Sequence, residues 1–370
     1  MLAYFFIIAT LLILMMTGQY FYEEGKDITS AVFYVGVIEL CFFMAFRSYL
    51  VGADTKEYYV GFQQLADSSL RNLQSTVLYG FGGNYTLNFE YGYRLFNKLI
   101  SYISHNPQTI IICTGLMTVG LFAILIKRYS PNPLLSLWLY VTLGLFQTQM
   151  NISRNSLAII ITYFGIKYIH NNKFFSFLFF VLIGSLIHSS VLLMIPIYFL
   201  VNYSHLNRKK VNVYFVFSLI IGLILGVGRN IVVHFIPSKY AYLSHTANVK
   251  LEGLLVGVMY ILFFSLIYLT NLKVSNEMIK ENQVGTWMFL IAILFYVSGI
   301  GLSFATRVAI IFGTFMVIYF PRLAYTHGID PNKRKILIAI IVLLSGIQYI
   351  LRLNLNNIGG TIPYTFFWSI

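Results

Sequence analysis

Isolated arginines at the ends of apolar segments are the residues of this sequence best suited to bind a charged ligand. Arg154 opens a predicted helix, where the positive end of the helix dipole disfavours a cation unless an anion joins it. Arg307 repeats this placement, and Arg47 follows another apolar run. Because the arginine fork binds phosphate through two parallel hydrogen bonds, the pattern indicates an anionic ligand. Pairing of Arg154 with Asp54 or Glu90 to brace the helices stays open.

Two acidic segments supply groups that could position or deprotonate a hydroxyl. Asp54, Glu57 and Tyr58 fall on one helical face. Glu90, Asn97 and either Tyr93 or Arg94 share a second face. An ordinary helix start capped by Asp54, with the preceding arginine at the membrane interface, explains the first segment equally well.

The segment His188-Ser189-Ser190 separates two short apolar runs. Histidine changes its charge near neutral pH, so His188 is a candidate proton acceptor. A hydrogen-bonded packing role is the alternative.

The elements that must position these residues are membrane helices. The chain has 370 residues, 58% hydrophobic and 10% charged, which excludes a soluble domain. We predict an all-α, polytopic transmembrane helical bundle of about 12 spans. The spans are predicted at 1–22, 28–46, 107–126, 133–150, 156–170, 174–187, 189–201, 211–227, 254–271, 285–303, 308–320 and 336–351.

The chain is predicted to form one transmembrane domain over residues 1–370, with two long loops at 47–106 and 228–253. Glycines such as Gly222 and Gly226 are expected to permit close helix packing. The sequence shows no internal repeat and no pair of glycine-interrupted half-helices.

Alternating the loops between two sides concentrates lysine on one of them. By the positive-inside rule this side is cytoplasmic, so the chain ends and both long loops are extracytoplasmic. The basic residues of the cytoplasmic side are Lys26, Lys127, Arg128, Lys167, Lys173, Arg208, Lys209, Lys210, Lys273, Lys280, Arg322, Lys333, Arg334 and Lys335. The outer side is instead dominated by arginine, which again suggests an anionic ligand there.

Other kinds of chemistry lack support in the sequence. Cys41 and Cys113 lie inside apolar runs, so neither a disulfide framework nor a thiolate metal site is expected. The net charge of +13 follows membrane topology rather than a basic stripe for nucleic acid. No nucleotide-binding, zinc-protease or serine-hydrolase motif is present. The first apolar run lacks the features of a cleaved signal and is expected to be a mature helix.

Together these motifs resemble the EpsG family, which is similar to the Wzy-type polymerases of bacterial polysaccharides. The resemblance covers nearly the whole chain and depends on the order of short motifs. One departure is Asn155-Ser156 after the arginine, where the family tends to have glutamine and a small residue. The matching positions are Arg47, Gly52, Asp54, Tyr58, Glu90, Gly92, Tyr93, Asn97, Arg154, Ala158, His188, Ser189, Ser190, Arg307, Pro363 and Tyr364.

The resemblance implies a glycosyltransferase of the bacterial inner membrane whose active face is periplasmic or extracytoplasmic. It would transfer a growing glycan from undecaprenyl diphosphate to a sugar hydroxyl of another lipid-linked repeat unit. The implied partners are the lipid-linked oligosaccharide, the bilayer, a chain-length regulator and a flippase, with no cofactor, metal or nucleic acid.

Within this hypothesis Arg154 and Arg307, with Arg47 as a third candidate, neutralise the departing diphosphate. His188, Asp54 or Glu90 deprotonates the acceptor, and we favour His188 as the base. The other predicted substrate-binding residues are Tyr58, Tyr93, Asn97 and Tyr364.

Two other functions remain open at this point. A flippase for lipid-linked oligosaccharide would also carry arginines, but should show pseudo-symmetry or broken helices. A membrane O-acyltransferase using His188 would leave polymer length unchanged when deleted.

Overall fold

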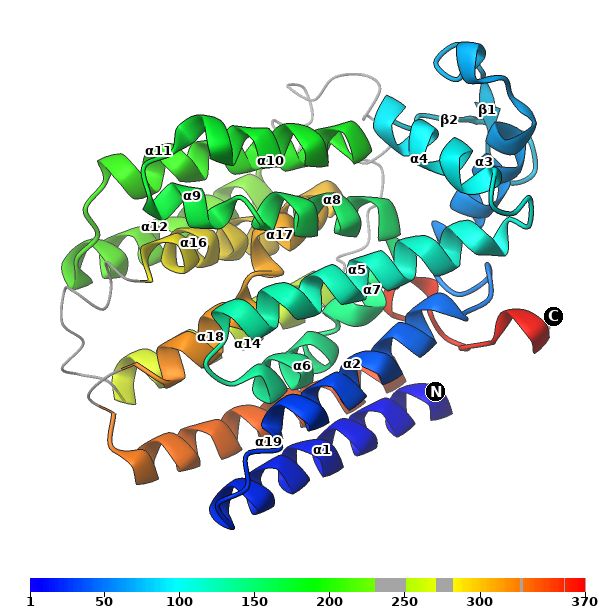
Figure 1. Cartoon of the computed structure of the whole chain (residues 1–370). Helices are drawn as coiled ribbons and strands as arrows, with labels where there is room; N and C mark the ends of the chain where they lie inside the picture. Colours follow the sequence, from blue (N-terminus) through cyan, green and yellow to red (C-terminus); the bar gives the residue numbers. More distant parts are fainter. Residues whose placement is uncertain (230–250, 271–281, 327–328, 356, 370) are drawn as a thin grey trace.

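The protein is an all-α bundle with one short β-hairpin at its edge (Figure 1). The computed structural model describes residues 1–229, 251–270, 282–326, 329–355 and 357–369. The predicted loop at 228–253 therefore lies almost wholly outside the described residues.

The chain enters the bundle through two antiparallel helices and then forms a smaller outer unit. Its elements are α1 (Leu2–Glu23), α2 (Thr29–Ala45), α3 (Thr55–Asp67), η1 (Leu70–Asn72), β1 (Leu78–Tyr79), β2 (Thr86–Leu87) and α4 (Tyr91–Ser101). The bundle continues with α5 (Gln108–Tyr129), α6 (Pro133–Thr142), α7 (Leu145–Asn151), α8 (Ser153–Tyr163), α9 (Ile166–His170), α10 (Phe174–Ile187), η2 (Ser189–Met194), α11 (Ile195–Tyr203) and α12 (Arg208–Val227). It ends with α14 (Leu251–Thr270), α16 (Gln283–Ser298), α17 (Ser303–Gly313), α18 (Met316–Ala324), α19 (Pro331–Leu355), η4 (Ile358–Gly360) and η5 (Phe367–Ser369).

Every predicted span overlaps one of these helices, but many of the helices are short. Among the described residues, 4 helices are long and apolar enough to cross a membrane, and up to 5 if α17 and α18 form one bent span. Six further apolar helices have 10–17 residues. The protein is thus an all-helical membrane protein, and about twelve spans stays a prediction.

Three of the predicted spans are broken, contrary to the expectation of uninterrupted helices: 133–150 between α6 and α7, 156–170 between α8 and α9, and 308–320 between α17 and α18. Between α6 and α7 the chain turns at Gly144, whose φ is +74°, and an added Cβ there would lie 2.6 Å from the Arg352 side chain. The helices α17 and α18 are bent by 50°. The elements at two of these breaks contact each other, because the Ser136 hydroxyl in α6 donates to the Val317 carbonyl in α18.

The chain reverses direction at His188, as the predicted separation of residues 174–187 from 189–201 requires. The helix α10 packs against α8 and α4, whereas α11 returns beside α9 and α16 (Figure 1). The backbone of His188 is extended, with φ −153° and ψ 117°, and this ends α10. The predicted separation at His188 is confirmed.

The lysine-rich turns gather at one end of the bundle, opposite both chain ends and residues 47–106 (Figure 1). Lys335 at the start of α19 pairs with Glu23 at the end of α1, with 3.2 Å between Nζ and Oε1. Lys127 at the end of α5 donates to the Ser30 hydroxyl at the start of α2. The described residues of the predicted cytoplasmic side therefore share one end, while Lys273 and Lys280 lie outside the described ranges.

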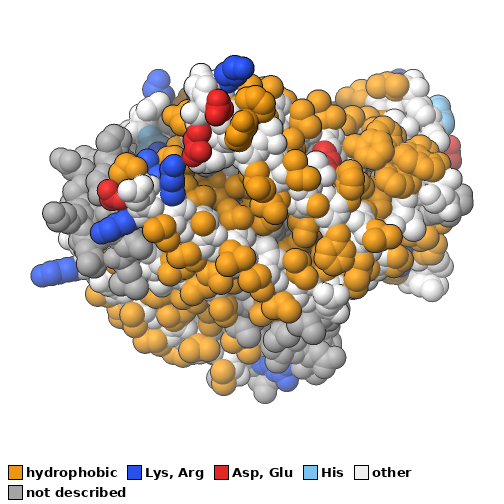
Figure 2. Space-filling model, turned by 90° about the horizontal axis from the view of Figure 1, so that it is seen from below, with side chains coloured by type: hydrophobic (Ala, Val, Ile, Leu, Met, Phe, Trp, Pro, Cys, Tyr) orange, Lys and Arg blue, Asp and Glu red, His pale blue; other side chains and the backbone are white. Residues whose placement is uncertain are grey.

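The face of the bundle that carries α1 and α19 is covered with hydrophobic side chains, and Lys and Arg gather at its left end in Figure 2. Exposed Ile13 and Met16 of α1 and Leu343 of α19 contribute to this apolar surface. Such a surface is suited to lipid. Close packing at Gly222 is confirmed, because an added Cβ would lie 2.7 Å from the Leu294 carbonyl in α16.

Candidate functional site

Arg154 emerges from a break between α7 and α8 that buried Arg47 holds in place. The Arg47 side chain is completely buried. Its Nη2 donates to the Met150 carbonyl at 3.0 Å and to the Ser153 hydroxyl at 2.8 Å, and its Nη1 donates to the Met44 carbonyl. The fork of Arg47, predicted to bind substrate, is therefore engaged with the free carbonyls of a helix break and is not exposed in this structure.

Other arginines of the outer side serve backbone carbonyls in the same way. Arg94 donates to the carbonyls of Phe89, Leu73 and Thr76, and Arg352 donates to the Leu143 carbonyl at 3.0 Å. The arginine bias of this side is thus in part structural, since five fixed donors can cap several carbonyls at once. Arg154 and Arg307 are the predicted ligand-binding arginines that stay partly exposed.

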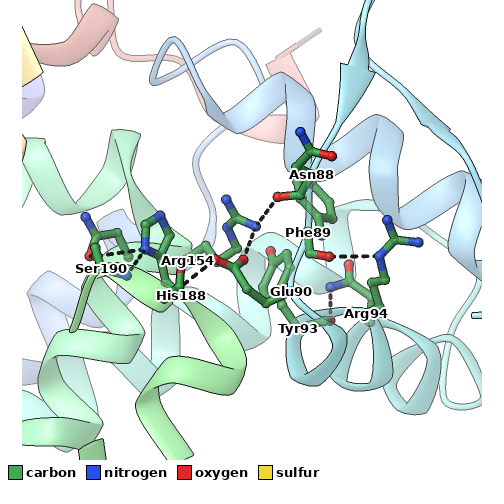
Figure 3. Close-up of polar contacts among 11 residues, drawn as sticks. Asn88, Phe89, Glu90, Tyr93, Arg94, Arg154, His188 and Ser190 are labelled. Carbon is green, nitrogen blue, oxygen red and sulfur yellow. Dashed lines mark hydrogen bonds and ion pairs between the residues drawn. The ribbon is translucent and has the colours of Figure 1, made fainter. Parts of the chain in front are cut away.

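Arg154 pairs with Glu90 at the start of α4 (Figure 3). Its Nη1 lies 2.6 Å from Glu90 Oε2 and 2.9 Å from the Asn88 carbonyl oxygen. The guanidinium also stacks over the rings of Phe89 and Tyr93, at 4.9 Å and 5.7 Å from their centroids. The pairing left open by the sequence is thus present.

This ion pair leaves much of the arginine fork available. Glu90 meets only Nη1, and its second oxygen, Oε1, accepts from the Ser189 backbone N–H at 2.9 Å and from the Ser189 hydroxyl at 3.2 Å. A purely bracing pair would use the bidentate geometry that arginine and carboxylate prefer. Within the described residues, the buried Nε of Arg154 has no hydrogen-bond partner. Arg154 therefore has donor groups beyond those that Glu90 and Asn88 use.

Arg307 forms a looser pair with Asp54 next to the first. Its Nη2 lies 3.6 Å from Asp54 Oδ2, and the two side chains are 53% and 31% exposed. Exposed pairs of this kind contribute little to stability and exchange readily. Asp54 does not cap α3 through its side chain, so the capping alternative does not describe its carboxylate.

Backbone contacts from distant segments place Asp54 at this position. Its N–H donates to the Asn151 side-chain oxygen at 2.8 Å, at the end of α7. The preceding Gly52 and Ala53 donate to the carbonyls of Gly360 and Gly359 in the C-terminal tail. Gly52 has φ +101°, and an added Cβ would lie 3.0 Å from the Asn151 Cα. Asp54 is thus fixed by α7 and by the tail together.

Gly52→Ala should destabilise the protein more than the same change at Gly25, a glycine whose φ is also positive but which has open space around it. Gly25 also has positive φ, +80°, but nothing lies within 4 Å of an added Cβ. We expect Gly52→Ala to lower the free energy of unfolding by about 1–3 kcal/mol more than Gly25→Ala, the usual cost of overpacking. Reversible unfolding in mixed micelles measures both values, and equal losses would contradict the tight contact at residue 52.

His188 turns its Nδ1 toward Ser190 (Figure 3). The Ser190 backbone N–H donates to Nδ1 at 3.3 Å, and its hydroxyl lies 2.8 Å from the same atom. Burial, followed by the charge of Arg154, lowers the pKa of His188 to about 4. The imidazole is therefore neutral at pH 7, and the bond to Nδ1 favours the tautomer that carries its proton on Nε2.

The predicted charged residues, except Arg47, lie close to His188 at one end of the bundle. The charges of Arg154, Glu90 and Arg307 all act on His188, and those of Asp54, Arg154 and Arg307 act on Tyr58. We call this site the arginine mouth. It consists of the four charged groups Arg154, Glu90, Arg307 and Asp54 together with His188.

Of the other predicted substrate-binding residues, Tyr58, Tyr93 and Asn97 are buried and Tyr364 is half-buried. Tyr58 and Tyr93 contact each other in the core beneath the arginine mouth, with ring centroids 6.0 Å apart. Asn97 is buried and donates to the Tyr93 carbonyl within its own helix. Tyr364 donates from its hydroxyl to the Phe43 carbonyl and fastens the tail to α2. In this structure the first three of these residues lie beneath the charged groups of the site, and the fourth anchors the tail.

Several residues that complete the site were not among the predicted ones. Ser189, Asn88 and Asn151 orient Glu90, Arg154 and Asp54 respectively through the contacts above. Polar residues at the edges of apolar runs are the one signal of such a role, and the sequence does not show which distant group each contacts.

The described residues contain no group of three or more histidine, cysteine or acidic side chains that could hold a metal ion. No curated protein and no solved structure matches the chain. The model of the EpsG family matches residues 30–366. Because this match covers nearly the whole chain, the chain belongs to the EpsG family.

Proposed function

We propose that the protein is a membrane polysaccharide polymerase that uses a lipid-diphosphate-linked glycan as its donor. The observation that carries the proposal is the arginine mouth, where Arg154 and Arg307 come from different helices and each is paired with one carboxylate. Membership of the EpsG family supports a polymerase-type role in polysaccharide biosynthesis.

The charges of the mouth suit an exchange of partners. Two arginines and two carboxylates balance in the free protein, so a diphosphate binds by displacing a carboxylate. The Asp54–Arg307 pair is the longer and more exposed one and would open first, whereas Ser189 and Arg154 hold Glu90 from both sides. Diphosphate binding to Arg307 would thereby release the Asp54 carboxylate.

In the proposed reaction, a sugar hydroxyl of the acceptor repeat attacks the anomeric carbon of the donor glycan. The bond from this carbon to the diphosphate oxygen breaks, and its electron pair leaves with the lipid diphosphate, which Arg154 and Arg307 stabilise. The acceptor proton passes to Asp54. His188 Nε2 carries a proton in the favoured tautomer, so it can donate a hydrogen bond but cannot accept the proton of the acceptor hydroxyl. We therefore propose Asp54 as the base in place of His188.

Lipid and topology complete the proposal. The donor would be an undecaprenyl diphosphate glycan in a bacterial cytoplasmic membrane, and the arginine mouth would face the extracytoplasmic side, opposite the lysine-rich end. A flippase and a chain-length regulator would act beside the protein. The apolar flank of the bundle provides a surface for the lipid chain.

Gel analysis of surface polysaccharide from a deletion strain tests the function. We expect products with a single repeat unit, restored to full length by the intact gene. Full-length polymer in the deletion strain would contradict a polymerase and would agree with a modifying enzyme such as an O-acyltransferase.

Transport of lipid-linked oligosaccharide is a second candidate, which the broken helices favour. Discontinuous helices such as α6–α7 and α17–α18 occur at transporter binding sites. Loss of a flippase strands lipid-linked repeats in the cytoplasmic leaflet, whereas loss of a polymerase leaves them in the outer leaflet. Protection of the repeats from a membrane-impermeant glycosidase in intact spheroplasts would therefore indicate transport.

A further inference from the structure

The segment from Leu78 to Leu87 is a β-hairpin seated on one face of α3. The Gln64 side chain bonds to both backbone polar groups of Tyr79, at 2.7 Å and 2.8 Å. Glu57 accepts from the Phe81 backbone N–H at 3.0 Å and from the Tyr85 hydroxyl. Positions 57 and 64 lie two helical turns apart on the same face, so side chains of α3 hydrogen-bond to the hairpin both at its strands and at its tip.

A glycine between these two positions lets the outer unit pack closely. An added Cβ at Gly61 would lie 2.5 Å from the Phe89 ring. Leu78, Leu87 and Phe89 fill the space between hairpin and helix as part of one hydrophobic cluster. The packing between the hairpin and α3 is therefore filled without the aromatic side chains that the hairpin carries on its outer side.

Three aromatic rings of the hairpin nevertheless face outward. Tyr79 is 51% exposed, Phe81 47% and Tyr85 49%. Lys56 Nζ lies 5.4 Å from the centre of the Phe81 ring. The hydrogen bond that the Tyr85 hydroxyl donates to Glu57 fixes the orientation of the Tyr85 ring and raises the pKa of this hydroxyl to about 12. Aromatic rings held in place at the surface bind with little loss of conformational entropy.

The aromatic hairpin adjoins the arginine mouth through both of its supports. The helix α3 begins immediately after Asp54, one turn before Glu57. At the other side, β2 leads directly into Asn88 and Phe89, which hold Arg154. Three extended residues cover about 10 Å, so Tyr85 stands roughly that far along the chain from Asn88. A sugar chain whose diphosphate occupies the arginine mouth therefore reaches the hairpin.

We infer that the aromatic hairpin is a saccharide subsite that binds the glycan portion of the lipid diphosphate substrate. This inference rests on the proposed function. The apolar C–H faces of sugar rings pack against the electron-rich faces of Phe81 and Tyr85, as aromatic edges do. Lys56 and the backbone of the exposed glycine turn at Gly82 and Gly83 offer hydrogen bonds to the hydroxyl groups.

Phe81→Ala tests the subsite with two probes on the purified full-length protein in lipid nanodiscs. The first probe is a single repeat-unit oligosaccharide released from the host polymer, with binding measured by saturation-transfer NMR. The second is inorganic pyrophosphate, measured by calorimetry. We expect oligosaccharide binding to weaken about tenfold, as for loss of one packed ring, while pyrophosphate binding is unchanged.

Matched variants distinguish a saccharide subsite from a general effect of removing a surface ring. Tyr22→Ala removes an aromatic ring that is 67% exposed near the lysine-rich end and should leave both probes unaffected. Phe81→Trp keeps a ring and should retain oligosaccharide binding. Unchanged oligosaccharide binding by Phe81→Ala overturns the inference, and so does quenching of the added tryptophan by brominated lipids, which would place the hairpin in the bilayer. Failure of pyrophosphate to bind the unmodified protein would instead count against the proposed function.

Discussion

Arg154→Lys is expected to stop polymer formation and to leave single lipid-linked repeats in the membrane. Lysine keeps the positive charge but replaces a planar fork by one ammonium group. Arg154 uses its Nη1 for Glu90 and the Asn88 carbonyl and needs its other nitrogens for the diphosphate. We expect the turnover rate to fall by about 10²–10³-fold, as when one donor to a transition-state charge is removed.

The effect should fall on catalysis more than on folding. The Arg154–Glu90 pair is partly exposed, at 14% and 24%, so its loss leaves no fully buried charge behind. Two measurements separate these effects: the length of surface polysaccharide on gels, and the amount of variant protein in isolated membranes. Arg71→Lys, at an exposed position of η1, is the matched control and should make full-length polymer. Normal polymer length in Arg154→Lys would exclude Arg154 from the reaction.

The sequence predicted well those features that depend on neighbouring residues. Apolar runs located the helices, and the distribution of basic loop residues identified the lysine-rich end, because both follow from the transfer of nearby side chains into lipid. The pairing of Arg154 with Glu90 was one of two alternatives that the sequence left open, whereas Arg47, expected beside Arg154 and Arg307, is buried in the helix break.

Features that depend on distant contacts could not be predicted. Arg47 and Arg352 look like Arg154 in the sequence, yet they bond to carbonyls at positions 150 and 143, where helices break. The break at Gly144 lies within a continuous apolar run, where a glycine is equally compatible with close helix packing. The packing of the tail on residues 46–53 depends on backbone bonds that leave no pattern in side-chain types.

Asp54→Asn is expected to reduce turnover more severely than any change at His188. Asparagine has nearly the same shape, and the backbone N–H of residue 54 can still donate to Asn151. The amide cannot accept a proton at pH 7, so the acceptor hydroxyl loses its base. Removal of a general base typically costs about 10²–10⁴-fold. Transfer between lipid-linked repeats by the purified protein in vesicles measures the effect, and Asp67→Asn at the end of α3 is the matched control.

His188→Gln distinguishes the two candidate bases. The glutamine amide can donate a hydrogen bond from a position close to that of Nε2, but it cannot accept a proton at pH 7. If His188 only donates a hydrogen bond, the variant should retain most of its turnover.

The pKa of His188, about 4, means that the wild-type ring gains a proton only as the pH falls toward that value, since burial and Arg154 both disfavour its charged form. Neutral His188 therefore supports stability fully above its unfolded pKa of about 6.5 and loses this contribution as the pH falls through about 4. A variant with His188→Gln that is inactive but folded, beside an active Asp54→Asn, would reassign the proton to the histidine.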